Sequence, residues 1–261
     1  MGRTVSGDIL DVIDGAWAAP TWEERARLAR SALNLDPDAL DGYLALSTVV
    51  ETSIERFALL REAVRRGDAL WSDAAKHPEE GFFWNCLDTR PWMRSIHALA
   101  VALWDNDGRI EAASLADKLV RLQPSDSLGA RYLGLSWHAT LGNWAKVEKI
   151  LRSCAKGDDG SADFLWPRLL SEFRLGRDTK GALADAMDSN PHVPRRLLDE
   201  RSTVVDSEWV SLGSPEEAIS YALYGKEAWA AVPGALDWLK SVVPEAGSKP
   251  KGRSRRATRD A

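Results

Sequence analysis

Residues able to bind metals or to catalyse reactions are few in this sequence, and their spacing matches no catalytic motif. The four histidines are scattered without the spacing of metal ligands: His77, His97, His138 and His192. Cys86 and Cys154 are the only cysteines, and neither lies in a Cys-x-x-Cys motif, so we expect two buried thiols in a reducing compartment. The sequence contains no phosphate-binding loop, dinucleotide-binding fingerprint, HExxH motif or nucleophile elbow. We therefore predict no catalytic residue, no metal and no cofactor, and we do not expect an enzyme.

Two interpretations are open for His97 and His138, because helix geometry can bring both to one groove. One is a metal site. The other, which we favour, is a pair of exposed or helix-capping histidines. Acidic pairs such as Glu216 and Glu217 are best interpreted as helix starts, where carboxylates interact favourably with the helix dipole.

The composition is that of an ordinary globular protein with an uneven charge distribution. Of the 261 residues, 44% are hydrophobic and 28% are charged, and the net charge is -5. From Lys249 onward the chain holds six basic residues against Asp260, a net charge of +5, so the remainder carries about -10. An acidic body does not suit a phosphate-binding surface, so nucleic acid is not the expected partner.

The sequence also predicts where the protein is located. No apolar run approaches the ~18–20 residues that cross a bilayer. Residues 1–14 contain a single basic residue and no cleavage motif. We expect a cytoplasmic protein without a transmembrane segment.

The elements that must position any functional residue are helices. Apolar residues recur every three or four positions, and Thr21 to Glu24, Thr52 to Glu55 and Ser214 to Glu217 fit the capping-box spacing. Prolines at 37, 91, 215 and 233 suit a first helical turn. We predict helices near 7–17, 22–34, 38–50, 53–66, 90–106, 109–122, 127–141, 144–155, 162–175, 179–189, 215–231 and 234–243. Because the turns between them are short, consecutive helices should pack as antiparallel hairpins.

These elements suggest five regions along the chain. They are N-terminal hairpins at 1–67, a connector with an aromatic plug at 68–89, repeats at 90–198, a connector and capping hairpin at 199–245, and a disordered basic tail at 246–261. The plug would consist of Phe82, Phe83 and Trp84. The tail cannot bury apolar area, because it is rich in glycine, serine, lysine and arginine.

A repeat of about 34 residues defines the architecture. Pro124, Asp158 and Pro191 close successive hairpins at intervals of 34 and 33 residues. The first hairpin supplies Leu99, Ala100, Leu103, Gly108, Ala112, Ala116, Leu119 and Pro124; the second supplies Leu133, Gly134, Trp137, Gly142, Trp144, Val147, Leu151 and Cys154. This pattern resembles the tetratricopeptide repeat, although Asp158 replaces its terminal proline. The resemblance implies an all-α fold: a tetratricopeptide-like, right-handed helical solenoid of antiparallel helix hairpins.

A narrower resemblance covers residues 82–239. The segments RPWMR at 90–94 and QPSDSLGARY at 123–132 resemble motifs of a bacterial group related to the suppressor-of-tumorigenicity-seven family, R-P-Y-M-R and N-P-x-D-N-x-G-x-R-Y. Trp92 stands for the tyrosine, and Ser125 and Ser127 replace asparagines. This resemblance implies a scaffold or adaptor and no enzymatic role. Pro91 as a helix start and Trp92 packed on Phe83 or Trp84 would explain RPW structurally.

The register of the tetratricopeptide family implies a candidate binding groove. In that register the first helix of each hairpin lines the concave surface with Arg94, His97, Val101, Trp104, Arg131, Leu135, His138, Phe164 and Arg168. Arginines can bind carboxylates through two parallel hydrogen bonds, and aromatic side chains can anchor a partner. The groove would therefore bind another protein or peptide that carries acidic groups. The alternative is that these arginines pair with Asp or Glu on neighbouring helices.

We therefore predict a protein–protein interaction scaffold or adaptor that binds a partner segment in this groove. A different class remains open: a nucleic-acid- or membrane-associated regulatory protein acting through its basic C-terminal tail. For that tail we favour a solubilising role.

Overall fold

The computed structural model describes residues 6–76, 83–154, 159–199 and 210–243, and all regular elements in these ranges are helices. The chain divides into two compact units, Met1–Asp159 and Gly160–Ala261. We call them unit 1 and unit 2. The boundary between them falls inside the predicted repeat region 90–198. The predicted basic tail at 246–261, most of the connector 199–213, and Phe82 of the predicted aromatic plug lie outside the described ranges.

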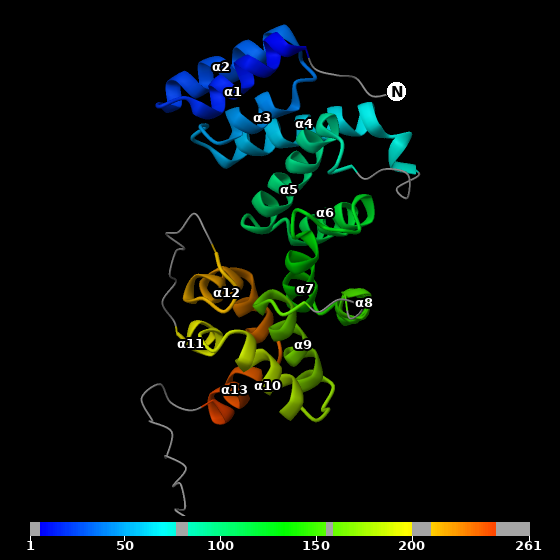
Figure 1. The fold of residues 1–261 in the computed structure, drawn as a ribbon, viewed down its shortest axis with the longest axis vertical. Coiled ribbons are helices and arrows are strands. Elements are labelled where there is room, and N and C mark those ends of the chain that lie inside the picture. Colours follow the sequence, from blue (N-terminus) through cyan, green and yellow to red (C-terminus); the bar gives the residue numbers. More distant parts are fainter. Residues whose placement is uncertain (1–5, 77–82, 155–158, 200–209, 244–261) are drawn as a thin grey trace, which may run out of the picture. The chain divides into compact units, whose positions relative to one another are not determined.

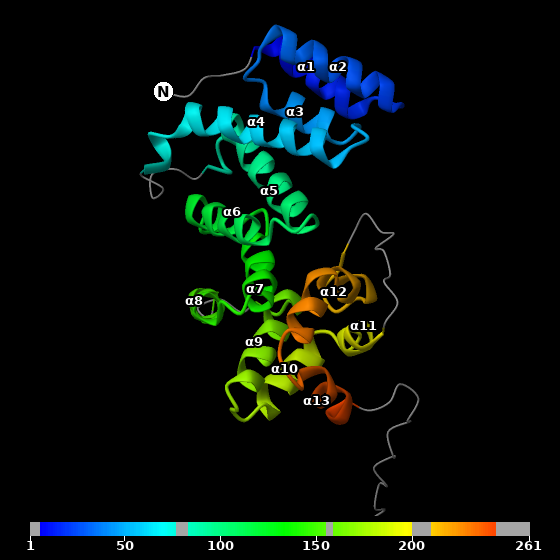
Figure 2. The same ribbon diagram turned by 180° about the vertical axis from the view of Figure 1, so that it is seen from behind.

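Unit 1 contains eight α-helices within its described residues. They are α1 (Gly7–Ala18), α2 (Trp22–Leu35), α3 (Leu40–Ser47), α4 (Ser53–Trp71), α5 (Arg90–Trp104), α6 (Arg109–Leu122), α7 (Ala130–Thr140) and α8 (Trp144–Cys154). Two short 3-10 turns, η1 (Ala74–Lys76) and η2 (Leu87–Thr89), lie between α4 and α5. Each α-helix packs against the next, and α3 also contacts α1 and α5 (Figures 1 and 2). Unit 1 is thus a series of helical hairpins.

The predicted caps start several of these helices. The hydroxyls of Thr21, Thr52 and Ser214 accept hydrogen bonds from the amides three residues on, at 3.2, 3.2 and 3.1 Å. The prediction for Pro37 was wrong, because α3 begins only at Leu40. The carboxylate of Asp36 accepts from the amide of Asp38 at 2.9 Å, and this local turn competes with the helix.

One turn geometry recurs at the interval found in the sequence. Asp107, Gly142 and Gly176 have φ of 64°, 72° and 64°, in the left-handed region, and are 35 and 34 residues apart. In each case the next amide donates to the carbonyl five residues back, at 2.8, 2.8 and 3.1 Å. These bonds satisfy carbonyls at the end of the first helix of a hairpin.

A second recurring feature ends the second helix of three hairpins. Asp36, Gln123 and Asn190 are buried, have extended backbone, and donate their amides to the carbonyl four residues back at 2.9, 2.9 and 3.0 Å. A proline follows each of them. Because Pro cannot continue the helix, the chain turns sharply into the next hairpin.

The predicted crossing residues of the hairpins are buried. Ala112, Ala116 and Leu119 of α6 and Val147 of α8 are at most 2% exposed. Small side chains at Ala112 and Ala116 let α6 approach its neighbours closely. Leu133 and Leu151 of the same pattern are only partly buried, so the sequence pattern identified part of the core of these hairpins.

In the described part of the connector between α4 and α5, Phe83 packs into the core. Pro91 lies in the first turn of α5, and the ring of Trp92 meets that of Phe83 edge-on, with centroids 5.6 Å apart. Helix α4 continues to Trp71, five residues beyond the prediction. Cys86, predicted to be buried, is exposed, because the described residues 83–89 bury only Phe83 and Thr89 in the core.

Unit 2 contains α9 (Ala162–Arg174), α10 (Lys180–Ser189), α11 (Val193–Leu198), α12 (Pro215–Ala230) and α13 (Ala235–Val242). Helix α11 was not predicted. Trp166, Tyr221 and Trp229 fill the core, and the ring of Trp229 stacks on Trp238 at a centroid distance of 6.5 Å. The carboxylate of Glu217, 3% exposed, accepts hydrogen bonds from the backbone amides of Ala162 and Gly213 and from Nδ2 of Asn190.

Candidate binding surface

Arg94, on α5, forms an ion pair with a buried aspartate of α3. Its Nη2 donates to Oδ2 of Asp41 at 2.5 Å. Burial raises the pKa of Asp41, and the charge and hydrogen bond of Arg94 oppose this shift. The side chain of Arg94 is still 42% exposed, so a partner in solution can reach it.

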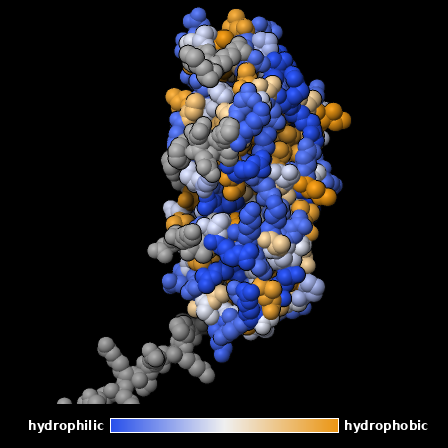
Figure 3. All heavy atoms as spheres, turned by 90° about the vertical axis from the view of Figure 1, so that its right-hand side faces the viewer, coloured by the Kyte–Doolittle hydropathy of each residue, from blue (hydrophilic) through white to orange (hydrophobic). Residues whose placement is uncertain are grey.

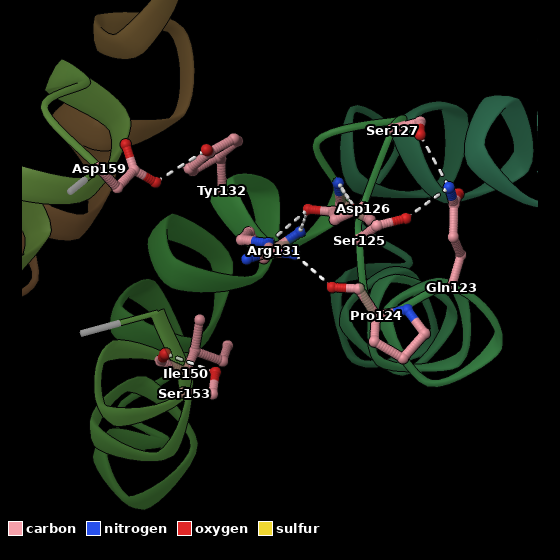
Figure 4. Close-up of polar contacts among 11 residues, drawn as sticks. Gln123, Pro124, Ser125, Asp126, Ser127, Arg131, Tyr132, Ile150, Ser153 and Asp159 are labelled. Carbon is pink, nitrogen blue, oxygen red and sulfur yellow. Dashed lines mark hydrogen bonds and ion pairs between the residues drawn. The ribbon is translucent and has the colours of Figure 1, made fainter. Parts of the chain in front are cut away.

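His97 and Arg131 lie near one carboxylate, that of Asp126. Arg131 donates its Nε and its backbone amide to Oδ2 of Asp126, both at 2.9 Å, and its Nη2 to the carbonyl of Pro124 at 2.6 Å (Figure 4). Burial raises the pKa of Asp126, against the effect of these bonds, and burial lowers the pKa of His97, against the charge of Asp126. Arg131 is thus held within its own turn.

This turn corresponds to the segment 123–132 that carries the narrower family resemblance. Asp126 also accepts from the amide of Ala130 at 2.8 Å, so its carboxylate caps the start of α7. Nε2 of Gln123 donates to the hydroxyls of Ser125 and Ser127 at 3.0 and 2.7 Å (Figure 4). The motif residues therefore shape the turn between α6 and α7, a structural role.

Tyr132 ends this segment with a contact to the last residue of unit 1. Its hydroxyl donates to Oδ2 of Asp159 at 2.8 Å. Burial and this carboxylate raise the pKa of Tyr132 to about 12. The tyrosine therefore stays protonated and keeps this hydrogen bond at neutral pH.

Three predicted groove residues of unit 1 are buried among the helices. Trp104 stacks on Trp137 with ring centroids 4.8 Å apart, and Leu135 has no exposed surface. His138, 4% exposed, hydrogen-bonds through Nε2 to Asp117 at 3.1 Å. These three side chains hold the hairpins together and present almost no surface to a partner.

Asp117 also pairs with Lys146. Nζ of Lys146 lies 2.7 Å from Oδ2 of Asp117. Burial alone would raise the pKa of Asp117, but the hydrogen bonds from His138 and Lys146 lower it to about 2. The carboxylate is therefore ionised and joins α6 to the hairpin α7–α8.

The remaining predicted groove residues belong to unit 2. Phe164 is 5% exposed and packs in the core of that unit. Arg168 is exposed, with Nη1 3.5 Å from Oδ2 of Asp185. The structure therefore supports a common surface only for the residues of unit 1.

All three predicted groove arginines pair with an aspartate, but only Arg94 and Arg168 pair with one on a neighbouring helix, as the alternative interpretation expects. Arg94 pairs with Asp41, Arg131 with Asp126 and Arg168 with Asp185. The accessible part of the predicted groove in unit 1 is Arg94 with His97 and Val101, both partly exposed. We call these three residues the α5 face.

Sequence reasoning missed the carboxylates that pair with Arg94, Arg131 and His138. Asp126 could have been found, because it lies five residues before Arg131 in the motif. Asp41 lies 53 residues from Arg94 and Asp117 lies 21 residues from His138, and no sequence signal joins them. Large exposed apolar side chains at the starts of α2, α4 and α6 were also missed.

Nothing in the described residues resembles a metal centre. In the four described ranges, no three His, Cys, Asp or Glu residues come close enough together to hold an ion. His192 is exposed, and its amide donates to Oδ1 of Asn190 at 3.0 Å in a local turn. His77 lies outside the described residues. No described helix is long and apolar enough to cross a membrane.

The described residues thus form helical hairpins, and Arg94, His97 and Val101 are the accessible predicted groove residues of unit 1. Residues 169–249 match the family described as "ST7 protein". The "Suppressor of tumorigenicity 7 protein-like" of Rattus norvegicus is 27% identical over 257 residues, covering 88% of this chain and 45% of that protein. The "Protein ST7 homolog" of Caenorhabditis elegans is 39% identical over 271 residues, covering 89% of this chain and 50% of that protein.

These matches link the chain to the ST7 proteins. The chain spans about half the length of the curated relatives it matches. The alignments extend beyond the predicted span 82–239, because they cover 88% or more of the chain. The relatives named above are animal proteins, so the resemblance to a bacterial group stays a prediction. Their names denote no enzymatic activity.

Proposed function

We propose that this chain is a protein–protein interaction scaffold, a tetratricopeptide-like, right-handed solenoid acting in the cytoplasm. The observation that supports it best is the recurrence of one turn geometry, at Asp107, Gly142 and Gly176, every 34 or 35 residues. Stacked hairpins of this length present extended surfaces to partner segments, and their stability comes from contacts between neighbours. The similarity to ST7 proteins, whose names denote no enzyme, agrees with a binding role.

The partner segment lies along the α5 face. Arg94 engages Asp41 through Nη2 and is 42% exposed, so part of its guanidinium can donate to a carboxylate of the partner. Val101 offers apolar area two turns further along the same helix, and His97 lies between them. The buried side chains of Trp104, Leu135 and His138 pack in the core and hold the hairpins of unit 1 together.

Arg131 and Arg168 contribute less to the partner site than Arg94. The hydrogen bonds of Arg131 to Asp126 and Pro124 hold it in place, and a partner carboxylate would have to replace them. Arg168 lies in unit 2 and is exposed, so we propose that it serves a separate contact, while Phe164 packs beneath in the core of that unit.

Site-specific photo-crosslinking in the native host tests this function. A photoreactive amino acid at Val101 should capture a defined protein, whereas the same group at Lys149, an exposed residue of α8, should not. Arg94→Gln removes the charge and keeps a donor for Asp41, and should reduce the Val101 capture about tenfold. Circular dichroism controls for folding. Equal capture from both positions, or capture unaffected by Arg94→Gln in a folded variant, would contradict the proposal.

A further inference from the structure

We propose a second interaction surface on unit 1, which binds a protein segment rich in both basic and apolar residues. It consists of the starts of three second helices: Trp22 of α2, Ile54 of α4 and Ile110 of α6. These side chains are 76, 78 and 80% exposed. We call this surface the α2–α4–α6 edge. It is separate from the α5 face and does not depend on it.

The three side chains lie in the first turns of their helices. Trp22 is the first residue of α2, and Ile54 and Ile110 are the second residues of α4 and α6. Each follows the short turn that joins the two helices of its hairpin. Single exposed apolar residues are common on proteins. An exposed apolar side chain among the first two residues of the second helix, in three consecutive hairpins, indicates a surface that repeats with the fold.

Hydrogen bonds place the starts of α2 and α4 at one end of α3. Nη1 of Arg25 donates to the hydroxyl of Thr48 at 3.3 Å. Nε of Arg56 donates to the carbonyl of Ser47 at 3.2 Å. Arg25 is three residues after Trp22, and Arg56 is two residues after Ile54, so both apolar side chains lie near this end of α3.

An ion pair places the start of α6 along α4. Arg61 donates through both terminal nitrogens to the carboxylate of Glu111 at 2.7 Å. Glu111 follows Ile110, and Arg61 comes seven residues, or about 10 Å of helix, after Ile54. A bound segment of about two or three helical turns can therefore contact both isoleucines.

Exposed carboxylates accompany the three apolar side chains. Glu23 follows Trp22, Glu51 precedes Ile54 by three residues, and Asp107 precedes Ile110 by three. Among the residues the structure describes, these carboxylates form no ion pair or side-chain hydrogen bond. Glu23 lies in the first turn of α2, where the helix dipole stabilises a carboxylate. Glu51 and Asp107 precede the N-caps of α4 and α6, so they lie outside the first turn.

The arginines at the same edge make contacts within the hairpins. Nε of Arg25 donates to the carbonyl of Ala16 at 3.3 Å, and Nε of Arg56 makes the corresponding bond to Ser47. The guanidinium of Arg109 lies over the ring of Trp104, 5.1 Å from its centroid. The free charges that accompany the apolar side chains are therefore negative, and charge complementarity favours a partner with lysines or arginines.

Figure 3 shows one face of the molecule. Hydrophobic side chains form small patches there, separated by hydrophilic ones. At the α2–α4–α6 edge, exposed carboxylates accompany the three exposed apolar side chains, so a partner would need several spaced apolar side chains with basic side chains between them. A basic amphipathic segment has this pattern.

The test uses two synthetic peptides of about 18 residues with leucine at every third or fourth position. One carries lysine at the polar positions and the other carries glutamate. Fluorescence anisotropy with the full chain should show saturable binding of the lysine peptide and at least about tenfold weaker binding of the glutamate peptide. The affinity should fall as the salt concentration rises, because exposed charges are screened.

Two sets of variants distinguish binding at this edge from nonspecific binding to exposed apolar side chains. The triple variant Trp22→Ser, Ile54→Ser and Ile110→Ser should weaken the lysine peptide about tenfold or more. A control with Leu35→Ser and Leu87→Ser, exposed apolar residues of α2's other end and of η2, should bind as the unmodified protein does. Circular dichroism should show both variants folded, because every altered side chain is mostly exposed.

A charge variant completes the test. Glu23→Gln, Glu51→Gln and Asp107→Asn remove the three carboxylates, and the asparagine tolerates the positive φ of position 107. This variant should bind the lysine peptide more weakly and with a flatter salt dependence. Equal binding of both peptides, no saturable binding, or an unchanged triple serine variant would overturn the proposal. It would also be overturned if sedimentation showed that the edge pairs two copies of this chain.

Discussion

Gly67 of α4 gives the sharpest test of how the first half of unit 1 is packed. A Cβ atom on Gly67 would lie 2.1 Å from Cδ1 and 2.6 Å from Cγ of Trp92. Trp92 is 1% exposed, its Nε1 donates to Asp68 at 2.9 Å, and its ring meets Phe83. The ring therefore cannot move without losing these contacts, and Gly67→Ala must distort the packing of α4 against α5.

The expected sign is opposite to the usual effect of this substitution. In the interior of a helix, Gly→Ala normally stabilises by about 0.5–1 kcal/mol. Overpacking a filled core costs about 1–3 kcal/mol. Carbon atoms pack best at about 3.5–4.0 Å. An approach of 2.1 Å is far closer, so we expect an overpacking cost near the upper end of about 1–3 kcal/mol. Gly67→Ala should therefore destabilise the protein by about 1–3 kcal/mol in net free energy of unfolding.

Urea unfolding followed by circular dichroism measures this effect. Gly15→Ala in α1 is the matched control, because its Cβ would meet Leu28 at an ordinary 3.6 Å, and it should stabilise by about 0.5–1 kcal/mol. The cost of Gly67→Ala should shrink in a Trp92→Leu background, where the smaller side chain can yield. A stabilising Gly67→Ala, similar to the control, would refute the packing of Trp92 against α4.

Three further predictions concern the carboxylates of Glu217 and Asp117 and the C-terminal tail. Glu217→Ala should destabilise unit 2 by about 3–5 kcal/mol in urea unfolding, because Ala162, Asn190 and Gly213 lose the acceptor that they reach at 2.9, 2.8 and 2.7 Å; a loss below about 1 kcal/mol would contradict this role. The pKa of Asp117 in the folded protein, about 2, lies below its ordinary value of 3.8. Its contribution is thus present above pH ~4 and lost as the pH falls toward ~2, so the stability difference from Asp117→Asn should shrink over that window. A difference that stays constant would exclude the paired carboxylate. Removing the chain after Val243 should leave the capture from Val101 intact at physiological salt, and its loss would instead assign binding to the basic tail.

The sequence predicts local features of this fold better than long-range ones. The hydroxyl caps at Thr21, Thr52 and Ser214 depend on residues three positions apart, so spacing alone identifies them. Helix α11 escaped notice because it has only six residues, with Pro194 in its first turn, too few to show a periodic pattern. The end of α4 at Trp71 depends on tertiary packing of its last turns, which local pattern does not specify.

The candidate surface was predictable only in part, and for the same reason. Spacing along α5 groups Arg94, His97 and Val101 on one side of the helix. Whether Arg94 is free depends on Asp41, which belongs to another hairpin. Burial of Trp104 and Leu135 likewise depends on how neighbouring hairpins stack. Sequence patterns thus locate the helical faces, while tertiary contacts decide which side chains remain available.

The most direct test of a scaffold role is the affinity of the protein captured through Val101. Its dissociation constant should be measured for the unmodified chain, for Val101→Glu, and for Arg27→Glu, which alters an exposed residue of α2. The proposed binding at the α5 face predicts that Val101→Glu weakens the complex about tenfold or more and that Arg27→Glu leaves it unchanged. Equal affinities for all three folded proteins would contradict binding at this face.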